Sequence, residues 1–132
     1  MSATPQDRSA IDQLLETAQA SLDRVQPADL AAALEAGAWL IDIRPLEQRQ
    51  RDGERAGATV VDRNLLEWRM DPTSLHRLPE ANDPDRWIIL VCDAGYSSSL
   101  AAVMLRTLGL HRATDLVGGF QAMSAHDAED HR

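Results

Sequence analysis

Residues 87–109 read WIILVCDAGYSSSLAAVMLRTLG. The apolar run Ile88–Val91 is typical of a strand that is buried on both faces. Cys92, the single cysteine of the protein, follows this run, and the turn-forming residues Asp93–Tyr96 come next. Ser97–Ser99 then supply hydroxyl groups that can cap the Ala- and Leu-rich helix behind them. The stretch therefore predicts a strand, a short turn and a helix in immediate succession.

This pattern places Cys92 at the end of a strand and under the amino end of a helix. Backbone N–H groups without helical partners and the positive end of the helix dipole both favour an anion there. A thiol in such a position is a candidate nucleophile. Most free cysteines behave as small buried hydrophobic residues, but the glycine-containing turn and the serine-rich helix start favour a reactive thiol at Cys92.

The rest of the sequence alternates between strand and helix patterns. Strands are expected at 39–43, 58–61 and 113–117, with a short edge strand at 24–26, and helices at 9–22, 28–36, 64–70 and 120–124 and after Pro45. Such alternation predicts an α/β fold, a central parallel sheet with helices on both faces. In this prediction residues 1–23 are an N-terminal helical extension, residues 24–124 are the domain, and residues 125–132 are a disordered polar tail.

The composition argues against several classes of function. The 132-residue chain carries a formal net charge of −8, which argues against nucleic acid or an anionic membrane surface as a partner. All 13 basic residues are arginine, so lysine Schiff-base chemistry and the phosphate-binding loop that ends in Gly-Lys are excluded. Four scattered histidines show no metal-ligand spacing. We therefore expect no metal site.

Cysteine usage and hydropathy bear on the compartment. A single cysteine forms no internal disulfide, and no apolar run approaches the roughly 20 residues of a membrane span. The amino terminus lacks the basic and then apolar pattern of a signal sequence. We expect a cytoplasmic protein. The sequence leaves its oligomeric state open.

Several motifs, in their order along the chain, resemble single-domain rhodaneses of the rhodanese-like sulfurtransferase family. The similarity extends from about Val25 to Met123. The matching pieces are Leu40–Pro45, Glu47, Gly53, Gly57-Ala58, Val91-Cys92, Gly95, Ser98, Ala101-Ala102, Leu105, Leu108-Gly109 and Gly118-Gly119-Phe120. No single piece is decisive, but the ordered set with a cysteine in the right place is fairly specific. The resemblance implies the rhodanese-like form of the α/β fold.

The resemblance also implies a function. Cys92 would take a sulfane sulfur from thiosulfate or a persulfide, hold it as a persulfide, and pass it to cyanide or a thiol. The loop that would bind the persulfide consists of Asp93, Ala94, Gly95, Tyr96, Ser97 and Ser98. No organic cofactor is implied, and the expected partners are a small-molecule donor and acceptor, with a sulfur-relay protein as a further candidate. The alternative is a rhodanese-like regulatory or redox-sensing binding module with little or no turnover.

Two departures from the family pattern bear on the substrate. Many active rhodaneses carry arginines where this chain has Asp93 and Ser97. A carboxylate beside the thiol disfavours the thiolate and repels thiosulfate.

Cysteine phosphatases of this architecture need an arginine six residues after the nucleophile, to bind phosphate bidentately. That position is Ser98, which argues against a phosphatase.

Four further residues are candidates for the pocket. Asp42 ends a predicted strand at the same sheet edge as Cys92, and Arg44 follows it; a structural ion pair is the favoured interpretation of these two. Trp68, like Tyr96, is a candidate wall of the entrance. Arg69 could supply the positive charge that the loop lacks, although an arginine on a short helix is more often a surface residue.

Overall fold

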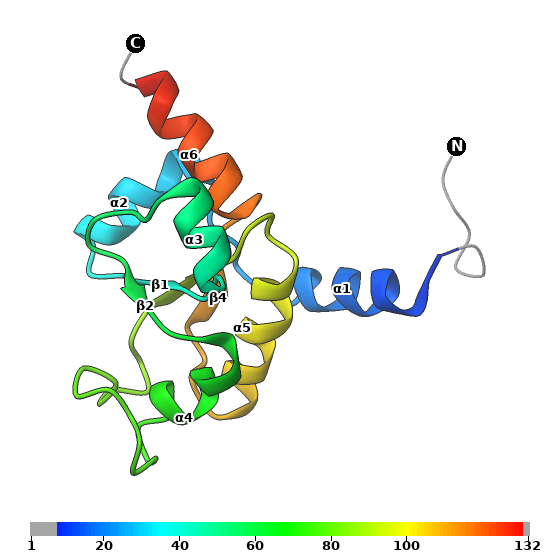
Figure 1. The fold of residues 1–132 in the computed structure, drawn as a ribbon. Helices are drawn as coiled ribbons and strands as arrows, with labels where there is room; N and C mark the ends of the chain where they lie inside the picture. Colours follow the sequence, from blue (N-terminus) through cyan, green and yellow to red (C-terminus); the bar gives the residue numbers. More distant parts are fainter. Residues whose placement is uncertain (1–7, 131–132) are drawn as a thin grey trace.

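The computed structural model describes residues 8–130, which form a parallel sheet between two layers of helices (Figure 1). The strands are β1 (Trp39–Asp42), β2 (Thr59–Val60), β3 (Ile88–Val91) and β4 (Ala113–Asp115). The helices are α1 (Ala10–Ala20), α2 (Leu30–Glu35), α3 (Leu46–Asp52), α4 (Leu66–Met70), α5 (Ser97–Thr107) and α6 (Gly119–Asp130), with short 3-10 turns at Pro27–Asp29 and Arg63–Leu65. The predicted α/β fold, a parallel sheet with helices on both faces, is confirmed.

All strand pairs are parallel, in the order β2-β1-β3-β4. The central strand β3 pairs Ile88 with Trp39 of β1 and with Ala113 of β4. The short edge strand predicted at 24–26 is present as a single parallel bridge from Val25 to Leu116. Because all strands run the same way, their carboxyl ends meet at one edge of the sheet, where Cys92 follows β3.

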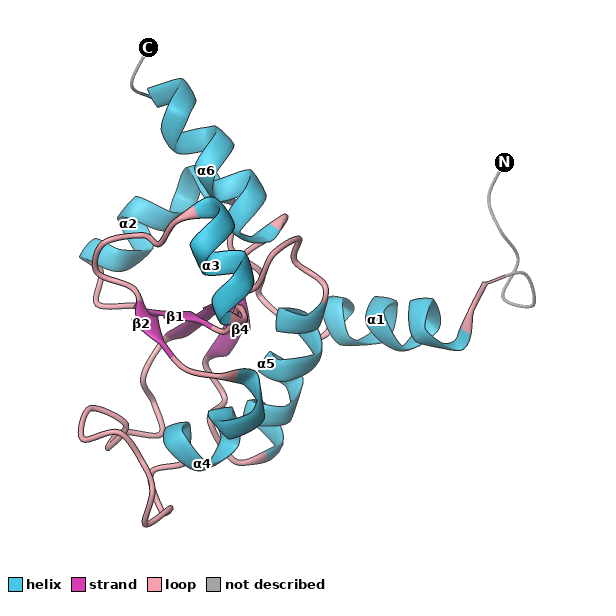
Figure 2. Ribbon diagram, in the orientation of Figure 1, coloured by secondary structure: helices cyan, strands magenta, loops and turns pink. Residues whose placement is uncertain are grey.

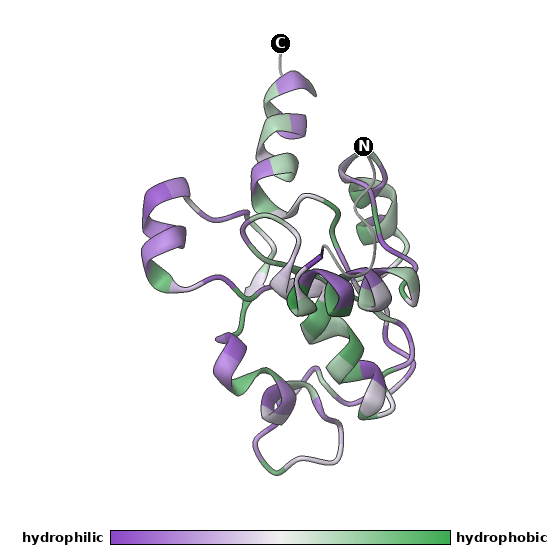
Figure 3. Cartoon of the chain, turned by 90° about the vertical axis from the view of Figure 1, so that its right-hand side faces the viewer, coloured by the Kyte–Doolittle hydropathy of each residue, from purple (hydrophilic) through white to green (hydrophobic). Residues whose placement is uncertain are grey.

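The two faces of the sheet carry separate hydrophobic cores because side chains alternate along each strand. Ile88 and Leu90 pack on the face covered by α4 and α5, whereas Ile89 and Val91 pack on the face covered by α2 and α6 (Figure 2). Helix α3 has no buried residue, and Figure 3 shows it at the left as a mostly hydrophilic segment.

Three local predictions were wrong. Ser97–Ser99 do not cap α5 from outside; they are its first residues, and the N-cap is Tyr96 without a side-chain hydrogen bond. The strand predicted at 113–117 ends at Asp115. Residues 125–130 of the predicted disordered tail continue α6 to Asp130, and residues 131–132 lie outside the described part of the chain.

The start of α6 supports the loop that follows Cys92. The N–H groups of Phe120 and Gln121 donate to the carbonyl oxygens of Cys92 (2.8 Å) and Asp93 (3.1 Å). Gly119 has a φ of +62°, and a Cβ on it would lie 2.6 Å from the Cys92 carbonyl oxygen. This backbone-to-backbone packing requires glycine at position 119.

A substitution at position 119 tests this packing. We expect Gly119→Ala to lower the free energy of unfolding by about 1–3 kcal/mol for the left-handed backbone, and the contact with rigid backbone adds to that cost. Gly37→Ala is the matched control, because Gly37 also has a positive φ (+100°) but nothing lies within 4 Å of its added Cβ. Urea unfolding measures both variants, and equal losses would contradict the close approach.

Candidate active site

The thiol of Cys92 lies under the first turn of α5, and only 4% of the residue is exposed. Its Sγ accepts hydrogen bonds from the N–H groups of Gly95 (3.2 Å) and Ser98 (3.4 Å) and lies 3.1 Å from Ser98 Oγ. Gly95 has a φ of +88°, and a Cβ there would lie 2.7 Å from the Gly118 nitrogen. The loop is therefore built to point N–H groups at the sulfur.

A pocket of about 310 Å³ opens beside this sulfur. It is lined by Ile43, Arg44, Pro45, Gln48, Cys92, Asp93, Ala94, Tyr96 and Ser97. All six predicted loop residues thus either line the pocket, as Asp93, Ala94, Tyr96 and Ser97 do, or donate a backbone N–H to the sulfur, as Gly95 and Ser98 do. Tyr96 is exposed at the entrance, as expected for a wall residue.

Sequence reasoning missed a buried network behind the loop. Asp115 of β4 accepts from the hydroxyls of Ser98 and Ser99, both at 2.7 Å, and from the guanidinium of Arg24. Arg24 also donates to the Gly95 carbonyl oxygen at 2.9 Å. A carboxylate inside a buried strand was a usable signal for Asp115, because a buried charge needs donors. Nothing local in the sequence marked Arg24.

Charged side chains surround the rim of the pocket. Asp93 Oδ1 lies 3.2 Å from Arg51 Nη2 and accepts from Gln121 Nε2 at 2.9 Å. Arg51 also bonds Asp52 at 2.6 Å; this hydrogen bond is the main cause that raises the pKa of Arg51 above its usual value and lowers the pKa of Asp52. The carboxylate next to Cys92 therefore has a cation beside it that the sequence did not reveal.

Asp42 and Arg44 form the structural ion pair that the sequence favoured. Arg44 Nη2 donates to Asp42 Oδ2 and to the Gly53 carbonyl oxygen, both at 2.8 Å. The guanidinium also stacks on the ring of Phe120, 3.6 Å from its centroid. Arg44 lines the pocket beside Cys92. Asp42 does not line it and holds the Arg44 guanidinium in position.

The structure does not bring Trp68 and Arg69 to the pocket. Both lie on α4, which packs against the far part of the α5 face, and Trp68 lines a separate surface hollow with Leu108. Arg69 donates to the carbonyl oxygen of His76 and so fixes the loop after α4. Neither Trp68 nor Arg69 is among the residues that line the pocket beside Cys92.

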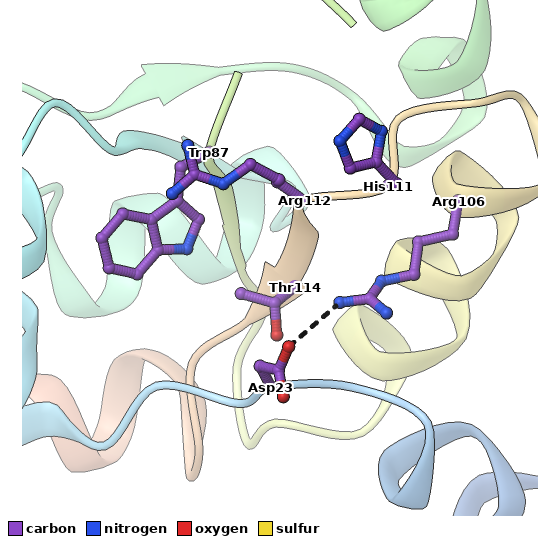
Figure 4. A pocket seen from close by; sticks show the side chains of 6 residues that line it. All are labelled: Asp23, Trp87, Arg106, His111, Arg112 and Thr114. Atoms are coloured by element: carbon purple, nitrogen blue, oxygen red, sulfur yellow. Dashed lines mark ion pairs between the residues drawn. The ribbon is translucent and has the colours of Figure 1, made fainter. Parts of the chain in front are cut away.

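A second hollow, of about 220 Å³, lies at the opposite edge of the sheet (Figure 4). Arg106 and Arg112 line it, but Arg106 donates to the carbonyl oxygens of Ala113 and Ser21, and Arg112 stacks on Trp87. These cations connect turns at the amino ends of β3 and β4. The hollow contains no thiol, whereas the other pocket exposes the Cys92 sulfur to loop N–H groups, so the pocket beside Cys92 is the candidate active site.

Residues 8–130 hold neither a clustered metal site nor a membrane-spanning helix. No group of three or more His, Cys, Asp or Glu side chains is arranged to hold a metal ion there. In the same part of the chain, no helix is long and apolar enough to cross a membrane.

The comparisons with known proteins identify the class. A family model described as rhodanese-like domain matches residues 26–126. Because this match covers most of the 132 residues, the chain belongs to the rhodanese-like domain family. The search of curated proteins gave no match.

Solved structures similar to this fold include the following three. A Rhodopseudomonas palustris protein of unknown function, described as a possible tyrosine phosphatase, has 28% identity and a TM-score of 0.80 over 96% of both chains. A rhodanese homologue from Thermus thermophilus has 30% identity and a TM-score of 0.55, covering 74% of this chain and 96% of its own. A human single-domain sulfurtransferase has 20% identity and a TM-score of 0.64, covering 77% and 95%; at that identity the likeness concerns the fold alone.

The buried pair offers a direct test of its structural importance. Asp42→Ala leaves the Arg44 guanidinium, 1% exposed, without its carboxylate. Removing one partner of a buried pair costs about 3–5 kcal/mol of unfolding free energy. Glu67→Ala is the control, because it breaks the more exposed Arg63–Glu67 pair on one helical face, where the expected cost is below about 1 kcal/mol. Similar losses for the two variants in urea unfolding would contradict this difference.

Proposed function

We propose that this protein is a sulfurtransferase that carries sulfane sulfur as a persulfide on Cys92. The proposal rests on one observation: the Sγ of Cys92 lies in the wall of an open pocket and accepts hydrogen bonds from two backbone N–H groups. Such N–H groups stabilise a sulfur anion without requiring a charged side chain. Membership of the rhodanese-like family supports the same chemistry.

In the first step the Cys92 thiolate attacks the outer sulfur of the donor. A bond forms between Sγ and that sulfur, the donor's own sulfur–sulfur bond breaks, and its electron pair leaves with the product. Thiosulfate releases sulfite, and a hydropersulfide releases its thiolate. The enzyme then holds Cys92–S–S⁻, whose terminal sulfur anion can accept hydrogen bonds from N–H groups of the loop Asp93–Ser98.

In the second step the acceptor, cyanide or a thiolate, attacks the outer sulfur of the persulfide. The sulfur–sulfur bond to Cys92 breaks, and the thiolate of Cys92 returns to its two N–H donors. Both steps are exchanges at sulfur, so the cycle needs no external oxidant or reductant.

The pocket favours a persulfide over thiosulfate as the donor. Ile43, Pro45 and Ala94 give it apolar wall, and Asp93 places a carboxylate next to the thiol. Arg51 offsets that charge, but Asp52 accepts from the same guanidinium at 2.6 Å. The rim therefore has no cation without a carboxylate partner that could bind the doubly charged thiosulfate. An organic persulfide carries less charge and does not need such a cation.

A phosphatase function is not supported by the site. In the loop, the position six residues after Cys92 holds Ser98, whose hydroxyl bonds Asp115. Behind the loop, the guanidinium of Arg24 is committed to Asp115 and to the Gly95 carbonyl oxygen. Phosphate would lack the bidentate clamp that this chemistry requires.

A redox-sensing or regulatory module is the second candidate. The observation that favours it is the loop itself, which holds Asp93 and Ser97 where many active rhodaneses have arginine. Such a module would retain the buried thiol but turn over little sulfur.

Sulfur loading separates the two candidates. Purified protein is incubated with thiosulfate or with a small alkyl hydropersulfide, and intact mass and cyanide-releasable sulfur are measured. We expect one added sulfur atom, more readily from the persulfide, and none in Cys92→Ser. A wild-type protein that takes up no sulfur from either donor would reject the enzyme and leave the regulatory module.

The charge at position 93 should set the choice of donor. We expect Asp93→Arg to raise kcat/KM for thiosulfate about tenfold, because it replaces a repelling carboxylate with a cation. Asp93→Asn should give a smaller gain, and an alkyl hydropersulfide, which carries at most one negative charge, should respond less to both substitutions than thiosulfate does. The gain should shrink with added salt. Unchanged thiosulfate kinetics would contradict this electrostatic explanation.

A further inference from the structure

The hydroxyl of Ser98 lies between two acceptors but has one proton. Its Oγ is 3.1 Å from Cys92 Sγ and 2.7 Å from Asp115 Oδ2. An ionised carboxylate can only accept hydrogen bonds, so the short contact commits the Ser98 proton to Asp115. The lone pairs of Ser98 Oγ then face the sulfur. This arrangement suits a thiol, which can donate its S–H to that oxygen.

A thiolate at Cys92 needs the opposite arrangement. The sulfur anion would face oxygen lone pairs across 3.1 Å unless the Ser98 hydroxyl turns and donates to it. That rotation removes one of the hydrogen bonds to Asp115. The carboxylate and the thiolate therefore compete for the same proton.

The strength of Asp115 in this competition depends on its other donors. Ser99 Oγ donates to Oδ2 at 2.7 Å, and the Arg24 guanidinium bonds both carboxylate oxygens at 2.9 and 3.2 Å. Asp115 is fully buried, and the Arg24 side chain is 18% exposed. Arg24 thus neutralises a charge that water cannot reach, and it lets Asp115 release the Ser98 proton at lower cost.

We propose that Asp115 and Arg24 are positioning residues that control thiolate formation at Cys92 through the hydroxyl proton of Ser98. The inference deepens the proposed sulfur transfer and rests on Cys92 as its nucleophile. Asp115 holds the proton while the thiol is protonated, and Arg24 allows its release when the thiolate forms. When an acceptor expels Cys92 from the persulfide, the same hydroxyl receives the departing thiolate.

Other charged groups also face Cys92 and must stay constant in the test. Asp93 lies on the loop next to Arg51 of α3, and Arg44 lies in the pocket wall paired with Asp42. None of these is changed in the variants below. A difference between variants therefore reports on Asp115, Arg24 and Ser98.

The test measures the rate of Cys92 alkylation by iodoacetamide against pH, which follows the thiolate fraction. In Asp115→Asn the amide can donate to Ser98 Oγ, so the Ser98 proton turns to the sulfur. We expect the midpoint of the curve to move to lower pH by about one pH unit, the worth of one hydrogen bond.

The Ser98→Ala background separates this route from charge removal alone. Asp115→Asn also deletes a negative charge near the sulfur, and that effect persists without the Ser98 hydroxyl. We expect less than half of the shift to remain in Ser98→Ala. An equal shift in both backgrounds would overturn the proposal.

Arg24→Gln should shift the midpoint of the alkylation curve in the opposite direction. It also tests the proposal if the Asp115→Asn variant does not fold. Without Arg24 the carboxylate keeps the Ser98 proton more strongly, so the midpoint should move to higher pH. Arg106→Gln is the matched control, because Arg106 also bonds backbone carbonyls near this segment but not the network, and we expect no shift. A shift to lower pH in Arg24→Gln, or none, would overturn the proposal.

The alkylation experiment and the sulfur-loading experiment test separate proposals, so either proposal can be rejected without the other. Shifts in the stated directions without sulfur uptake from any donor would remove the sulfurtransferase and retain the control of the thiol. Sulfur uptake by a wild-type protein whose variants show no shifts would do the reverse.

Discussion

The buried carboxylate of Asp115 is the constraint on which the site depends. A charge that is fully enclosed must be met by donors, and here they come from distant parts of the chain, namely Arg24, Ser98 and Ser99. Satisfying this one group fixes the first turn of α5, the end of β4 and the segment after α1 against each other. Cys92 lies in front of that junction, and its geometry is a consequence of it.

Features encoded by neighbouring residues could be predicted from the sequence. The apolar run Ile88–Val91, the cysteine after it and the helix behind it are local patterns, and all three are present. The ion pair of Asp42 and Arg44 was also within reach because its members are two residues apart. The capping by Ser97–Ser99 was wrong for a non-local reason: Asp115 attracts the hydroxyls of Ser98 and Ser99 into the core.

Features that depend on the path of the chain were not predictable from it. Trp68 and Arg69 follow a strand near the site in sequence, but Trp68 lines a separate hollow with Leu108, and neither residue lines the pocket beside Cys92. Conversely, Arg51 reaches Asp93 across 42 positions and places a cation at the rim that no motif indicates. The order of residues 125–130 was missed because their polar composition resembles a tail, although Phe120 and Met123 anchor the same helix in the core.

The contacts of α1 and of the segment after it have a consequence for where the functional unit begins. Gln19 donates to the Gly95 carbonyl oxygen and to Ser99, and Arg24 donates to Gly95 and Asp115. Both residues precede position 26, where the match to the family begins. The family portion supplies the cysteine and its loop, whereas the preceding segment supplies two of the groups that hold them. Relatives that share the loop but differ before it can therefore differ in the reactivity of the same cysteine.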